Sequence, residues 1–184
     1  MIGFESEKEK AKRIAKENMN YKIQLELENK SFQKEVQKYT NRKTDCYNQI
    51  VAYKAAGNDR EAQKVYRQYR RADKALQTYE NAIERVENAI VVTDIATAEA
   101  RLSSIVPKLM NNVDLDNLQF QKAQTNALIE KANNILEPDD TNDSALNAEF
   151  AQFYNSIPTG NTSMSGNDQG LADLRTQLEQ AKRG

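Results

Sequence analysis

The chain has 184 residues, a formal net charge of −1, no His, no Trp, one Cys, six Gly and three Pro. Without His it lacks the commonest general base and metal ligand, so we expect no enzymatic activity and no metal or cofactor. With 29% charged residues and few helix breakers, the composition favours long helices that share a narrow apolar seam over a compact globule.

The charges are sorted along the chain. Residues 1–75 contain 18 Lys and Arg against 11 Asp and Glu, a net of +7, whereas residues 76–184 contain 8 against 16, a net of −8. A basic half attracts an anionic surface such as phospholipid headgroups or nucleic acid, and an acidic half can cover it. This asymmetry indicates a membrane or nucleic-acid partner.

The N-terminus combines a short apolar tip with a basic cluster. Apolar insertion together with positive charge is a two-signal mode of peripheral membrane binding, and each base adds about 1 kcal/mol near an anionic surface. The expected membrane-binding residues are Met1, Ile2, Phe4, Lys8, Lys10, Lys12, Arg13 and Lys16. No signal-peptide core and no stretch of about 20 apolar residues is present, so we expect a cytoplasmic, peripheral membrane protein.

A heptad pattern predicts a first long helix over about residues 5–55, roughly 75 Å in length. One position recurs every seven residues: Ala11, Asn18, Leu25, Phe32, Tyr39, Cys46 and Tyr53. Cys46 lies on this seam, so we expect a buried thiol rather than a nucleophile. Gly57 suits the left-handed residue that ends a helix, and Asn58 or Asp59 suits the cap of the next one.

A second heptad pattern predicts a helix over about residues 59–106. Its two lines are Ala62, Tyr69, Leu76, Ile83 and Ile90, and Val65, Ala72, Tyr79, Val86 and Thr93. Beyond Thr93 the register slips, because the apolar residues fall at Ile95, Leu102, Ile105 and Val106. Pro107 then stops or kinks the helix. A break of two to four residues between two long helices favours an antiparallel hairpin.

The remaining chain predicts shorter elements in an all-α fold. Residues 108–137 form one or two smaller helices, with Asp114 as a cap, and residues 138–169 form an acidic and flexible linker with a short helix at 144–154. Residues 170–184 form a C-terminal helix with Leu171, Leu174 and Leu178 on one face. An amphipathic helix tethered by a linker suits a groove in another protein.

This order of parts resembles the ESCRT-III family, the charged multivesicular body proteins, over essentially the whole chain. Residues 1–137 correspond to the family's helical core, and the turn around Lys54 and Gly57 looks like the family's hairpin turn. The tail resembles the type-one MIT-interacting motif. Its matching residues are Leu171, Asp173, Leu174, Leu178 and Lys182, whereas Gln177 and Ala181 stand where the family has arginine and leucine.

The resemblance implies a subunit that polymerises with copies of itself or other ESCRT-III subunits on anionic membranes, to remodel or sever them. The acidic C-terminal part would close the monomer by folding against the hairpin, and an AAA ATPase with an MIT domain would disassemble the polymer. Two alternatives stay open. One is a soluble coiled-coil scaffold, and the other is a filament that coats nucleic acid, for which the tyrosines of both helices would be stacking platforms.

Overall fold

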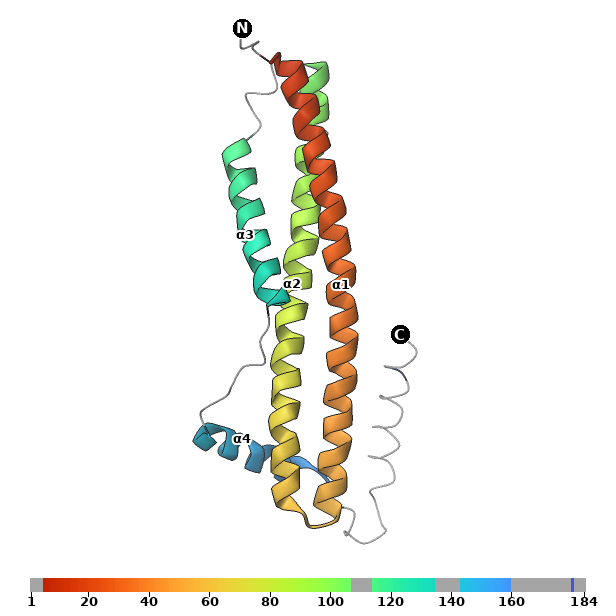
Figure 1. Cartoon of the computed structure of the whole chain (residues 1–184), viewed down its shortest axis with the longest axis vertical. Coiled ribbons are helices and arrows are strands. Elements are labelled where there is room, and N and C mark those ends of the chain that lie inside the picture. Colours follow the sequence, from red (N-terminus) through yellow and green to blue (C-terminus); the bar gives the residue numbers. More distant parts are fainter. Residues whose placement is uncertain (1–4, 107–113, 135–142, 160–179, 181–184) are drawn as a thin grey trace.

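The computed structural model describes residues 5–106, 114–134, 143–159 and 180, and all of its secondary structure there is helical. Helices α1 (Glu7–Ala55) and α2 (Asp59–Ile105) form a long antiparallel hairpin (Figure 1). Helix α3 (Leu115–Asn133) lies beside the half of the hairpin that is far from the turn, and α4 (Asp143–Ser156) crosses the hairpin near the turn. The all-α hairpin predicted from the heptads is therefore confirmed.

The turn between the long helices contains the left-handed glycine and the helix cap that its sequence predicts. Gly57 adopts a φ of 68°, a left-handed conformation that costs glycine little. The side chain of Asn58 accepts a hydrogen bond from the backbone N–H of Glu61 and so caps α2. Three residues thus reverse the chain, which places the two helices side by side along their whole length.

The seam between α1 and α2 follows the first heptad line. Five of its seven residues, Ala11, Asn18, Leu25, Phe32 and Cys46, are buried, and the other two are partly buried. All five residues of the second line on α2, from Val65 to Thr93, are buried as well. Removing this apolar stripe from water is the main stabilising contribution to a hairpin that is otherwise polar.

Beyond Thr93, the seam of α2 consists of small residues, not of the large apolar ones. Ala96, Thr97, Ala100 and Ser103 are buried against α1, whereas Ile95 and Leu102 are both 56% exposed. On α1 the facing cluster contains Ala11, Ile14 and Ala15. Small side chains on both helices let the backbones approach closely, so the same heptad register continues and the large apolar residues point outward.

Helix α3 begins where its sequence predicts, because the Asp114 side chain accepts a hydrogen bond from the backbone N–H of Asn117 at 3.0 Å. It packs on the hairpin through Leu118, Thr125 and Ala132. Lys122 Nζ donates to the buried Asn18 Oδ1 at 2.8 Å, and burial lowers the pKa of this lysine. A polar contact inside the seam fixes the position of α3 along α1.

Candidate functional site

Two parts of the molecule lie at opposite ends of the hairpin and are candidates for function. The first is the start of α1, where Ser6 and Glu9 form a capping box: the Ser6 hydroxyl accepts from the Glu9 backbone, and the Glu9 carboxylate accepts from the Ser6 backbone. This cap makes the helix regular from Glu7 onward, so the lysines that follow are held on a rigid element.

Three of the predicted basic residues form one row. Lys8, Lys12 and Lys16 are spaced by four residues, so they lie along the same side of α1, and all three are exposed. Within the described part of the chain, none of the three has an ion pair. Lys10 is also exposed but points to another side of the helix, because residues two apart do not share a face. We call Lys8, Lys12 and Lys16 the lysine row.

Arg13 differs from the lysine row because its charge is neutralised inside the chain. Its guanidinium donates to both carboxylate oxygens of Glu5 at 3.0 and 3.1 Å and to Glu17 at 3.1 Å. These hydrogen bonds, first to Glu5 and then to Glu17, raise the pKa of the arginine. The spacing of four residues is a sequence signal for the pair with Glu17, whereas the pair with Glu5, eight residues away, has no such signal.

The remaining predicted site residues lie outside the described residues. They are Met1, Ile2 and Phe4 of the apolar tip, and Leu171, Asp173, Leu174, Leu178 and Lys182 of the MIT-interacting motif.

The second candidate part is the end of the hairpin at the turn, where α4 packs across it. Phe153 lies with its ring centroid 5.0 Å from those of Tyr66 and Tyr69 and makes an edge contact with Tyr47 at 6.0 Å. Phe150 lies 5.3 Å from Tyr66. Offset and edge-to-face aromatic pairs of this kind add to the free energy gained from burial. The sequence predicted this short helix within a linker, and the structure packs it on the hairpin.

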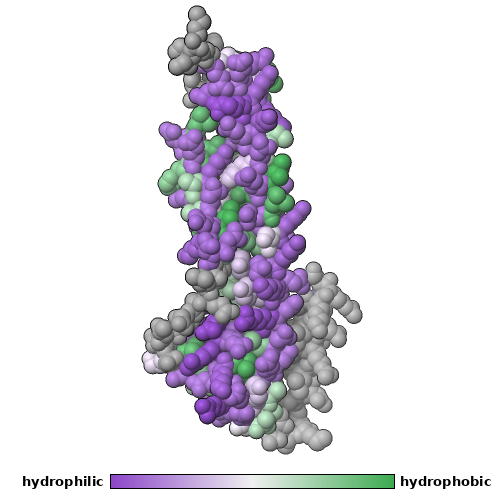
Figure 2. Space-filling model, in the orientation of Figure 1, coloured by the Kyte–Doolittle hydropathy of each residue, from purple (hydrophilic) through white to green (hydrophobic). Residues whose placement is uncertain are grey.

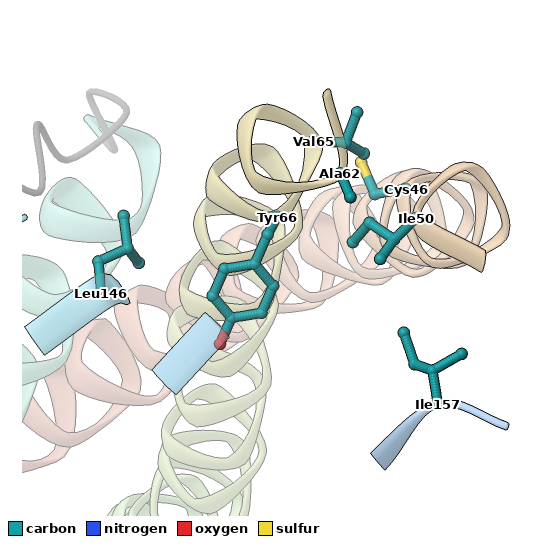
Figure 3. Close-up of a cluster of buried hydrophobic side chains, with 7 residues drawn as sticks. All are labelled: Cys46, Ile50, Ala62, Val65, Tyr66, Leu146 and Ile157. Atoms are coloured by element: carbon teal, nitrogen blue, oxygen red, sulfur yellow. The ribbon is translucent and has the colours of Figure 1, made fainter. Parts of the chain in front are cut away.

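Buried aliphatic residues complete the contact, as Figure 3 shows. Leu146 of α4 and Ile157 just after it are 7% and 3% exposed. Together with residues of α1 and α2 they form one cluster: Cys46, Ile50, Ala62, Val65, Tyr66, Leu146 and Ile157. Cys46 is therefore a buried thiol, as predicted, and burial raises its pKa. We call this cluster and its aromatic partners the α4 contact.

Polar groups at the turn bind the C-terminal end of α4. Lys54 Nζ donates to the backbone carbonyls of Tyr154 and Ile157, the latter at 2.6 Å, and lies 4.7 Å from the centre of the Tyr154 ring. A cation at a helix C-terminus satisfies unpaired carbonyls and complements the helix dipole. The Tyr154 hydroxyl donates to Asp59, which raises the pKa of that phenol to about 12.

An ion pair also joins α4 to the hairpin. Arg70 Nε lies 3.0 Å from a carboxylate oxygen of Glu149, although the geometry is not that of a hydrogen bond. Sequence reasoning identified none of these polar contacts, because their partners are about 80 to 100 residues apart in the chain and leave no local spacing signal.

The tyrosines of the long helices pack inside the molecule. Tyr39 stacks on Tyr79 at 5.8 Å, and Tyr66 stacks on Tyr69 at 5.9 Å within the α4 contact. Tyr21 donates to Asn126 of α3. Because these rings already face protein partners, they do not form a row of open platforms for the bases of nucleic acid.

Comparison with known proteins gives no match to a protein-family model, to a curated protein or to a solved structure. Across the described ranges, no helix combines the length and apolarity needed to cross a membrane. The same residues contain no group of three or more Cys, Asp or Glu side chains that could hold a metal ion.

Proposed function

We propose that this protein is an ESCRT-III-like subunit that polymerises on anionic membranes and remodels or severs them. The observation that carries the proposal is the lysine row, which is exposed, has no ion pairs in the described structure and lies on a rigid helix at the hairpin end remote from α4. Three lysines near an anionic surface contribute about 3 kcal/mol, which is weak for one molecule and strong for an array of copies.

The α4 contact supports an autoinhibited form of this subunit. α4 belongs to the acidic part of the chain and covers apolar and aromatic surface at one end of the basic hairpin. Its release would expose that surface to a neighbouring subunit. We further propose that an AAA ATPase with an MIT domain binds the tail through Leu174 and Leu178 and disassembles the polymer.

The proposal predicts that membrane binding depends on the lysine row. Reversing Lys8, Lys12 and Lys16 to Glu should abolish co-sedimentation with vesicles rich in phosphatidylserine, because attraction becomes repulsion. A matched control reverses Arg60, Lys64 and Lys38, which are exposed and lie outside the row, and should bind almost as wild type. Equal binding by both variants would reject the lysine row as the membrane site.

The same assay separates the alternatives. Two results together would favour the nucleic-acid filament. Single-stranded or duplex DNA would displace the protein from vesicles, and the variant with the reversed lysine row would lose DNA binding before it loses vesicle binding. If neither vesicles nor DNA bind at low ionic strength, the coiled-coil scaffold is favoured. The packed tyrosines of the hairpin argue against the first of these outcomes.

A further inference from the structure

Three large apolar side chains are exposed in succession along α1. Met19, Ile23 and Leu27 are spaced by four residues and are 45%, 53% and 62% exposed. The seam residues of the same stretch, Asn18 and Leu25, are 1% exposed, so the three apolar side chains lie outside the core of the hairpin. A group of exposed large apolar residues on one helix indicates a contact with another surface.

Four lysines flank these apolar residues, two before them and two after them, on the same face of α1. In a regular α-helix the seven residues fall within an arc of about 80° and extend over about 33 Å. All seven are exposed, and within the described structure none of the four lysines has an ion pair. We call them the α1 ridge: Lys12, Lys16, Met19, Ile23, Leu27, Lys30 and Lys34.

The three acidic residues within the span of the α1 ridge lie on other sides of the helix. Glu28 accepts a hydrogen bond from Asn133 of α3 at 3.5 Å, and Glu26 lines the groove between α1 and α2. Glu17 accepts from Arg13 at 3.1 Å. The α1 ridge therefore carries the positive charge of its four lysines and contains no acidic residue.

We propose that the α1 ridge lies along the surface of an anionic bilayer, with Met19, Ile23 and Leu27 inserted among the lipid headgroups. The lysines at both ends of the ridge contact the negative charges of the lipids. Lys12 and Lys16 also belong to the lysine row, so the contact runs from the end of the hairpin along the side of α1 (Figure 1). Apolar insertion combined with positive charge is the two-signal mode of peripheral binding.

The charges favour a lipid surface over a second copy of the chain on this ridge. Two ridges that faced each other would place lysines opposite lysines, which is repulsive. Exposed apolar residues of α2 differ in this respect, because the exposed Glu99 shares the side of Ile95 and Leu102 through spacings of four and three residues. An anionic membrane would repel that side of α2. This inference rests on the proposed function, because it names the surface of the subunit that contacts lipid.

Two isoleucines of nearly equal exposure provide a matched pair for testing the contact. Ile23 is 53% exposed on the α1 ridge, and Ile95 is 56% exposed on α2. Chains with Cys46→Ala and either Ile23→Cys or Ile95→Cys are labelled with an environment-sensitive fluorophore and bound to vesicles rich in phosphatidylserine. The fluorophore at position 23 should shift to the blue and be quenched by lipids with brominated acyl chains. The fluorophore at position 95 should show neither effect, and equal responses at both positions would overturn the inference.

Polar substitutions that keep every charge measure the contribution of the apolar residues. Ile23→Ser with Leu27→Ser should raise the Kd for these vesicles at least about tenfold, because large apolar side chains no longer leave water on binding. Ile95→Ser with Leu102→Ser removes similar apolar surface from α2 and should bind as wild type does. The difference between the two double variants should persist at high salt, because salt screens the lysines but not the apolar contact.

Two further outcomes separate this inference from the proposed function. If Ile23→Ser with Leu27→Ser binds vesicles as tightly as wild type, while reversal of the lysine row abolishes binding, the inference is overturned and the proposed function stands. If wild type binds no anionic vesicles, both are overturned. A blue shift at position 23 that grows with protein concentration in the absence of vesicles would assign the α1 ridge to a second copy and would also overturn the inference.

Discussion

At the residue scale, a few polar contacts determine how α4 ends on the hairpin. Lys54 donates hydrogen bonds to two backbone carbonyls at the end of α4. The Tyr154 hydroxyl donates a hydrogen bond to Asp59, the first residue of α2. Both hairpin partners flank the three-residue turn. The turn therefore does more than reverse the chain, because it carries the groups that recognise the C-terminal end of α4.

The Tyr154 contact predicts a specific titration. The phenol has an ordinary pKa near 10 when α4 is free and a pKa of about 12 when it donates to Asp59. Its contribution to docking is thus complete below pH 10 and is lost as the pH rises through 12. The difference in tyrosinate absorbance between wild type and Tyr154→Phe should show a midpoint near 12.

A matched variant tests the cause of this shift. Asp59→Asn removes the carboxylate charge that accepts the hydrogen bond of Tyr154. It should therefore return the titration midpoint of Tyr154 toward the ordinary pKa of a tyrosine. A wild-type midpoint at the ordinary value would show that the contact with Asp59 does not form in solution.

At the element scale, one aromatic residue of α4 contacts both long helices. Phe153 contacts Tyr47 of α1 and both Tyr66 and Tyr69 of α2. Phe153→Ala should weaken docking by about 2 kcal/mol, because it removes partly buried aromatic surface and three ring contacts. Hydrogen exchange over residues 143–159 should then rise by roughly thirtyfold. Phe120→Ala on α3 is the control, and equal exchange in both variants would show that Phe153 does not hold α4.

The elements differ in how far the sequence predicts them. Repeating apolar residues from Ala11 to Cys46 predict the seam, because burial follows the heptad. Beyond Thr93 the prediction fails, since Ala100 and Ser103 form the seam through their small size, which a pattern of large apolar residues does not detect. The pattern of α4 indicates an amphipathic helix, but it contains no information on which surface of the hairpin that helix covers.

At the scale of the whole molecule, the two ends of the rod differ in their chemistry. One end presents the exposed lysine row, and the other end is covered by α4. Figure 2 shows small hydrophobic patches on a hydrophilic rod, several of them on the half remote from the turn. The subunit that we propose binds an anionic surface at one end and is regulated at the other end, and it requires both of these regions.

The most direct test of the central claim is electron microscopy of the full chain with anionic and with neutral vesicles, for wild type and for Phe153→Ala. We predict filaments, spirals or tubules on anionic vesicles only, more abundant for Phe153→Ala because α4 is released. Bare anionic vesicles with dispersed protein for both chains would contradict a membrane-bound polymer.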